Sequence, residues 1–138
     1  MADFEFRKMT TGNVPEIQEF TADTALEAGD IAVIDGDGEA EKVADGTAAI
    51  DLVLVLADAE ADDTGVPCIW LDPTVVIEGT FTGTLGDVGD QCAIKVDTNV
   101  ITVEPVAASQ PAQFVIRDIV DATAQTVLLV RTTEDKVT

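Results

Sequence analysis

The stretch GDIAVIDGDGEAEKVA, residues 29–44, sets the pattern for the whole chain. An apolar run over residues 31–35 is followed by Gly36-Asp37-Gly38 and by a second short run over residues 39–44. Glycine and aspartate supply the positive φ angles that tight turns need, so this stretch predicts a β-hairpin.

Similar short runs with period-two alternation recur along the sequence. They cover residues 4–9, 16–21 and 75–82, and two more hairpins are predicted at 91–96 with 100–104 and at 113–120 with 125–132. The continuous apolar run 52–57 predicts a strand buried on both faces. Residues 66–71, broken by Pro67, predict an edge strand or an extended connection.

No long window has the apolar periodicity of a helix, although residues 16–20 and 57–63 each have room for one helical turn. About ten short strands separated by turns are typical of an all-β fold. We therefore expect a small antiparallel β-barrel or sandwich with an N-terminal extended arm. Residues 1–23 would form the arm or the first strands, and residues 24–138 a single β-barrel domain.

An internal echo accompanies this pattern. Gly29-Asp30 precedes one predicted hairpin, and Gly89-Asp90 precedes another. Two interpretations stay open here, because hairpins resemble one another and because a duplicated hairpin is also a common way to close a small barrel.

The charge is strongly one-sided, with 27 acidic residues against 7 basic ones and a formal net charge of −20. Nucleic-acid binding needs clustered lysine and arginine, and an anionic membrane surface would repel this chain, so both partners are excluded. Two explanations of the acidity remain: a solvated outer face, or adaptation to high salt, where charges are screened.

The residue types needed for most catalytic sites are missing. The chain has no histidine, and its one serine, Ser109, has no base to activate it. No glycine-rich phosphate loop is present. Cys68 and Cys92 are predicted to be buried reduced thiols, although a disulfide is possible. We expect no enzyme and no cofactor; a hydrolase using paired carboxylates is the weakest of the remaining hypotheses.

Carboxylate spacing raises the question of calcium, which prefers several oxygen ligands. Asp35, Asp37 and Glu39 alternate, but the glycine and glutamate that an EF-hand loop requires at its sixth and twelfth positions are absent. A second acidic cluster contains Asp58, Glu60, Asp62 and Asp63. The mismatch favours solvated turns at both places, so no metal ligand is predicted; calcium between two subunits stays a hypothesis.

Partner binding is predicted for a few residues outside the acidic loops. Phe4, Phe6, Arg7 and Lys8 form either the first strand of the barrel or an arm that adds a strand to a neighbour, with the two bases facing an acidic partner surface. Trp70 belongs either to the core or to an interface, where tryptophan is enriched.

The run TALEAGDIAVI, residues 24–34, resembles the opening hairpin of the small capsid decoration (cement) proteins of tailed bacterial and archaeal viruses, and the closing hairpin 113–130 is similar too. The resemblance implies a non-enzymatic virion protein that binds the major capsid protein lattice on the outer face of the head. It also implies a homo-oligomer, with a trimer favoured.

The N-terminus is charged and does not read as a signal peptide, and the longest apolar run, 48–57, is too short to span a membrane. These features predict synthesis in the host cytoplasm. The alternative to a virion protein is a small acidic metal- or ligand-binding β-domain from a halophile.

Overall fold

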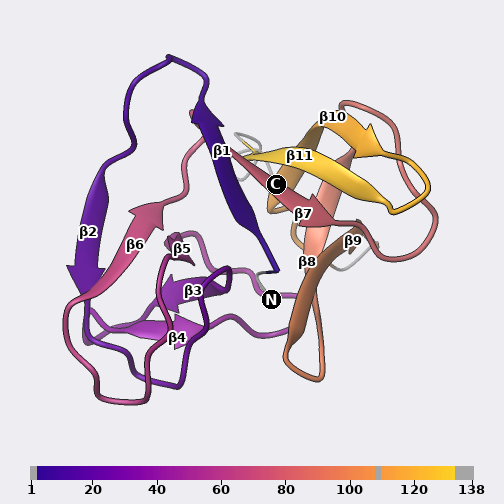
Figure 1. The fold of residues 1–138 in the computed structure, drawn as a ribbon. Helices are drawn as coiled ribbons and strands as arrows, with labels where there is room; N and C mark the ends of the chain where they lie inside the picture. The colour runs from indigo at the N-terminus through magenta and orange to yellow at the C-terminus, as the bar shows by residue number, and fades with distance from the viewer. Residues whose placement is uncertain (1–2, 108–109, 133–138) are drawn as a thin grey trace.

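The computed structural model describes residues 3–107 and 110–132 of the chain, and these residues form an all-β fold (Figure 1). Within them no helix is long and apolar enough to cross a membrane. The strands are β1 (Glu5–Met9), β2 (Ile17–Phe20), β3 (Ile31–Ile34), β4 (Ala40–Lys42), β5 (Leu52–Val55), β6 (Val66–Trp70), β7 (Val75–Thr80), β8 (Gln91–Asp97), β9 (Val100–Pro105), β10 (Phe114–Asp121) and β11 (Thr126–Arg131).

The strands form two antiparallel sheets. The five-stranded sheet has the order β2-β6-β5-β3-β4, and the six-stranded sheet has the order β1-β7-β11-β10-β8-β9. The first lies to the left in Figure 1 and the second to the right. Among the described residues the sheets do not close into a barrel, so the fold is sandwich-like. The all-β prediction is confirmed, and all three predicted hairpins are present, as β3–β4, β8–β9 and β10–β11.

The two sheets repeat one topology. Adding five to each strand number of the first sheet turns 2-6-5-3-4 into 7-11-10-8-9, which is the second sheet without β1. The register repeats as well, because Val55 pairs with Cys68 in the first sheet as Ile116 pairs with Leu129 in the second. The chain therefore contains two consecutive five-stranded units, and β1 is an added edge strand.

The turns that open the two units' hairpins match in detail. Asp30 Oδ2 accepts a hydrogen bond from the Glu27 N–H at 2.9 Å, and Asp90 Oδ2 accepts one from the Asp87 N–H at 2.8 Å. The glycine before each aspartate has a positive φ, 96° at Gly29 and 97° beside Asp90. The echo read from the sequence is thus a structural repeat of the same turn, in which a residue with a side chain would be strained.

The core consists of two apolar clusters, of which the larger joins the two units. The larger takes side chains from both sheets, among them Leu54 of β5 and Phe114 of β10. The smaller lies on the other face of the five-stranded sheet and includes Val53 and Val55 of β5. All four residues of β5 are buried, which confirms the strand predicted to be buried on both faces.

The prediction of an edge position for residues 66–71 is wrong. β6 lies between β2 and β5. Pro67 is tolerated there because it stands opposite Leu56, one residue past the end of β5, and its carbonyl still accepts the Leu56 N–H at 3.0 Å. The missing N–H of Pro67 therefore removes one hydrogen bond at the end of the β5–β6 ladder and none from its middle.

The helical turn considered for residues 16–20 is also wrong, because β2 occupies that segment.

Candidate functional site

The N-terminal strand β1 pairs antiparallel with β7 of its own chain, with Glu5 opposite Glu78 and Phe6 opposite Ile77. The register shifts between Phe6 and Lys8, which is a β-bulge at Arg7. In the single chain this segment is therefore a strand of its own sheet, which is the first of its two interpretations. Exchange of the strand with a neighbour stays a prediction.

The four N-terminal residues predicted to bind a partner differ in exposure. Phe4 is buried and stacks on Phe114 with ring centroids 6.3 Å apart, and Phe6 packs partly buried against the same cluster. Arg7 and Lys8 are exposed. The Arg7 guanidinium is bound to Glu78, with Nε 2.8 Å from Oε1, and this hydrogen bond raises the pKa of Arg7. Of these four side chains, the two bases are therefore the exposed ones.

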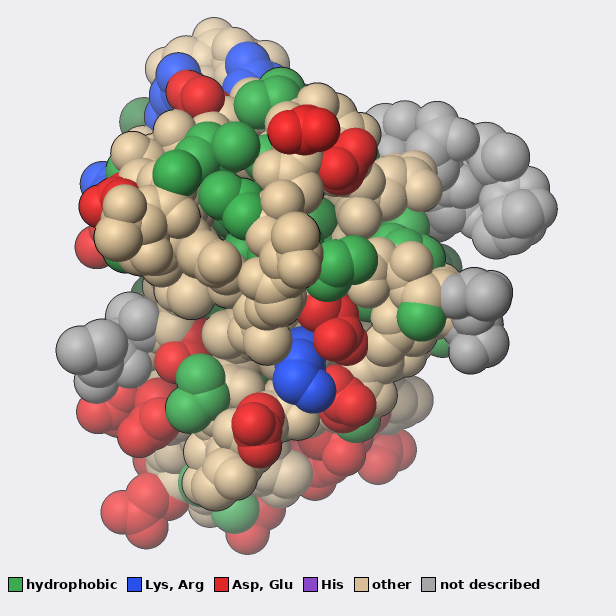
Figure 2. All heavy atoms as spheres, turned by 90° about the vertical axis from the view of Figure 1, so that its right-hand side faces the viewer, with side chains coloured by type: hydrophobic (Ala, Val, Ile, Leu, Met, Phe, Trp, Pro, Cys, Tyr) green, Lys and Arg blue, Asp and Glu red, His purple; other side chains and the backbone are tan. Residues whose placement is uncertain are grey.

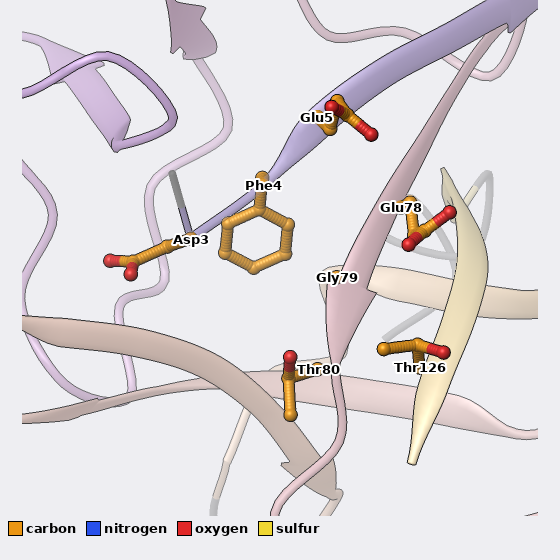
Figure 3. A pocket seen from close by; sticks show the side chains of 7 residues that line it. All are labelled: Asp3, Phe4, Glu5, Glu78, Gly79, Thr80 and Thr126. Carbon is orange, nitrogen blue, oxygen red and sulfur yellow. The ribbon is translucent and has the colours of Figure 1, made fainter. Parts of the chain in front are cut away.

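The side chain of Phe4 fits over a glycine. A Cβ built on Gly79 would lie 2.5 Å from the Phe4 ring, so no other residue leaves room for that ring. Figure 3 shows Phe4 directed toward β7 beside this position. A shallow pocket of about 300 Å³ borders it, lined by Asp3, Phe4, Glu5, Glu78, Gly79, Thr80 and Thr126. Its polar side chains are carboxylates and threonine hydroxyls, which bind cations or water more readily than they act as nucleophiles.

Trp70, the fifth predicted partner residue, lies on β6 in the other sheet. Its ring meets Phe20 edge-to-face at 5.7 Å, and its Nε1–H donates to Gln18 Oε1 at 2.7 Å. It packs against the smaller apolar cluster, whereas Phe4 belongs to the larger one. The predicted partner residues therefore do not form one continuous surface.

An acidic cluster forms around the β3–β4 hairpin. Carboxylate oxygens of Asp23, Asp35 and Glu41 all lie within 4.8 Å of one another. Asp37 and Glu39, which the sequence pattern groups with Asp35, are not part of this set. The pairing depends on an isolated parallel bridge between Ala22 and Ala40, which brings Asp23 beside the hairpin. No local sequence signal indicates this contact, so Asp23 and Glu41 were missed.

The charges in this cluster and on the neighbouring Glu39 are unevenly stabilised. A hydrogen bond with Asp35, then desolvation and repulsion from the surrounding carboxylates, raise the pKa of Asp23. Backbone N–H groups of Glu39 and Asp37 lower the pKa of Asp35, at 3.0 and 2.9 Å from its Oδ1. Partial burial, followed by repulsion from Asp23, raises the pKa of Glu39. The cluster thus favours one shared proton or a bound cation.

The cluster predicts that, at low salt, the protein gains stability as the pH falls through the range just above 3.8 and 4.5, the ordinary pKa values of Asp23 and Glu39. A carboxyl whose folded-state pKa is raised contributes stability that is lost as the pH rises through that pKa, and Asp23 and Glu39 are of this kind. Asp35 acts in the opposite direction: its lowered pKa contributes stability that is lost only as the pH falls below its ordinary pKa of 3.8. Melting temperature against pH measures this, and Asp23→Asn should flatten the slope while Glu16→Gln should not.

Both cysteines are buried and free, as predicted. They belong to different apolar clusters, Cys68 to the smaller and Cys92 to the larger. Burial raises the pKa of Cys68 to about 11, and burial together with Asp90 raises that of Cys92 to about 12. The thiolate is the reactive form, so neither thiol is equipped for catalysis in the folded state.

Thiol labelling of the folded protein is therefore expected to be slow at neutral pH. Two equivalents of a disulfide reagent should react promptly in denaturant, and almost none without it, because labelling requires opening of the core. Prompt reaction of either thiol in the folded protein would contradict the burial described above.

Acidic groups crowd the surface. On the face shown in Figure 2, aspartate and glutamate side chains gather over the lower half, and most of the few lysine and arginine side chains in view lie in the upper part. Ser109 lies outside the described residues. No protein-family model matches the sequence, and no curated protein is significantly similar to it.

Proposed function

We propose that the chain is a non-enzymatic virion structural protein, a decoration protein that binds the assembled head of a tailed virus from outside and stabilises it. One observation carries the proposal: an acidic β-body has β1 as an added edge strand, outside the repeated topology of its two units, and this strand presents Arg7 and Lys8 to solvent. The resemblance of residues 24–34 and 113–130 to decoration proteins supports the same assignment.

The proposed mechanism is mass action. A protein that binds only the assembled lattice of the major capsid protein lowers the free energy of that lattice and resists its disassembly. The acidic face would be turned to solvent, where its charge keeps particles apart and where high salt screens its self-repulsion. A homo-oligomer, a trimer in the family resembled, would multiply weak contacts into stable attachment.

The test is physical association. Particles are purified on a density gradient from a culture that produces the chain, and their proteins are quantified by mass spectrometry. We expect the chain at a fixed ratio to the major shell protein, with density on the outer surface by electron microscopy. Its absence from every particle fraction, together with a stable monomer in dilute solution, would overturn the proposal.

A second candidate function, metal binding by a small acidic β-domain, is favoured by the cluster of Asp23, Asp35 and Glu41. Three carboxylates at this spacing match the oxygen ligands that calcium takes. Calorimetry with calcium should then give heat that Asp23→Asn removes and Glu16→Gln, an exposed acid outside the cluster, retains. No heat at millimolar calcium would exclude this function for the isolated chain.

A further inference from the structure

At the outer edge of β2 the repeat of the two units is incomplete. β2 ends the five-stranded sheet and lies at the margin of the fold in Figure 1, and no strand of the described residues 3–107 and 110–132 pairs with its outer edge. Its counterpart in the second unit, β7, is covered by β1. An uncovered strand edge presents backbone N–H and C=O groups that another strand can bind.

The hydrogen bonds of β6 show which groups of β2 point outward. Pro67 O accepts from Leu56, and the Leu71 N–H donates to Leu52, so alternate residues of this segment face β5 and not β2. Glu19 stands opposite Pro67, and Ile17 stands opposite Ile69. The backbone groups of Ile17 and Glu19 therefore point away from β6, toward the open edge.

The repeat identifies what this edge is built to hold. Matching the pair Val55–Cys68 to Ile116–Leu129 places Glu19 on Glu78, because these glutamates pair with the residues just before Cys68 and Leu129. Glu78 is the residue that binds Arg7 of β1. Glu19 thus occupies, on an uncovered edge, the position that holds a strand-borne arginine on the covered one.

The same comparison limits the side chains of an incoming strand. Phe20 matches Gly79, so the space that Phe4 fills in the second unit is filled by Phe20 in the first. A strand bound to β2 must then carry a small residue at the position that Phe4, the residue just before β1, occupies in the second unit. The β1 strand of another copy does not meet this condition.

We infer that the β2 edge is a docking site for an extended strand of a partner protein, antiparallel to β2, with an arginine or lysine at Glu19 and a small residue opposite Phe20. Charge complementarity selects this occupant. Two β2 edges from copies of this chain would bring Glu16 and Glu19 of both together, and two bodies of net charge −20 repel each other. The exposed side chain of Ile17, 55 % accessible, would be covered by such a strand.

The inference rests on the proposed function only for the source of the strand, which would be a basic segment of the shell protein. Its chemistry is tested without particles. The probe is a capped synthetic peptide of residues 3–9 of this chain with Phe4→Ala, added to the full-length labelled protein while backbone amide signals are followed by NMR. The charge control is the same peptide with glutamine in place of Arg7 and Lys8.

We expect shifts centred on Ile17–Phe20 that saturate at millimolar peptide. Glu19→Gln should weaken binding about three- to fivefold, as for an exposed ion pair. Glu16→Gln, the same charge change just before β2, should weaken it less. Glu19→Pro should abolish binding, because it removes an outward N–H that the ladder to β6 does not use. A peptide N-methylated at the residue facing Glu19 tests the same bond with the wild-type protein, should the proline variant unfold.

Several results would overturn the inference: no shifts at the solubility limit of the peptide, shifts along β7 with release of β1, equal binding by Glu19→Pro, or a homodimer joined through β2. The particle experiment separates this failure from that of the proposed function. If Glu19→Pro still binds particles, the edge is not the shell contact, although the virion assignment stands. If the peptide binds but the chain is absent from all particles, the edge is real and the virion assignment fails.

Discussion

Phe4→Ala is expected to lower the free energy of unfolding by about 3–5 kcal/mol, the range for removing a buried phenylalanine ring. Phe4 is 2 % exposed, stacks on Phe114 and lies over Gly79. Loss of the ring leaves a cavity beneath β1. The residue under the ring, Gly79, has no side chain that could fill this cavity. Denaturant unfolding followed by tryptophan fluorescence measures the change, since Trp70 is the only tryptophan.

The position has two matched controls. Val14→Ala, on a side chain 87 % exposed, should change stability by less than about 0.5 kcal/mol. Gly79→Ala should destabilise the wild type, because its Cβ would overlap the Phe4 ring, but should do so much less in the Phe4→Ala background. Additive effects in this double-mutant cycle would show that Phe4 does not occupy the space over Gly79.

The local parts of this fold are predictable from the sequence. The β3–β4 hairpin follows from a glycine and aspartate turn flanked by apolar runs, and the β8–β9 hairpin follows from Asp97-Thr98-Asn99 between two such runs. Strand β5 follows from an uninterrupted apolar run. Burial of both cysteines follows from their apolar neighbours. Each of these features depends on residues close together in the sequence, where turn chemistry and side-chain period decide the outcome.

The candidate sites depend on pairings that no local pattern encodes. Arg7 meets Glu78 across a separation of 71 residues. Asp23 joins Asp35 only through the bridge between Ala22 and Ala40. The interior position of β6 is of the same kind, because a proline excludes a central strand only where its missing N–H would face a continuing neighbour.

The repeat was visible in the sequence only at its two Gly-Asp turns, for a physical reason. Matching positions have different neighbours: Trp70 corresponds to Arg131, and Phe20 to Gly79. The turn residues are set by backbone geometry, which both units share. The packing residues are set by what covers each unit, and that differs because β1 covers only the second.

Asp30→Ala is expected to lower the free energy of unfolding by about 2–3 kcal/mol, whereas Asp90→Ala at the matching turn should lower it by about 0.5–1 kcal/mol. Asp30 is 1 % exposed, accepts the Glu27 N–H and lies 3.7 Å from Lys42 Nζ. Asp90 makes the same turn bond but is exposed. The two variants remove the same hydrogen bond, so their difference measures what burial adds.

Asp30→Asn distinguishes the hydrogen bond from the charge. Burial raises the pKa of Asp30 despite Lys42 and the turn N–H, so the ionised form is disfavoured in the fold. The wild type should therefore lose stability as the pH rises above the ordinary value of 3.8, a loss that the asparagine variant lacks. Asp30→Asn should then lower the free energy of unfolding less at neutral pH than at about pH 4, and less than Asp30→Ala does at either pH.

Equal losses of unfolding free energy for Asp30→Ala and Asp90→Ala would mean that the first turn is as open to water as the second. A larger loss for Asp30→Ala would mean that the first turn is shielded from water, and the Phe4 N–H, which donates to Gly29 O at 3.0 Å, ties the N-terminal residues to that turn.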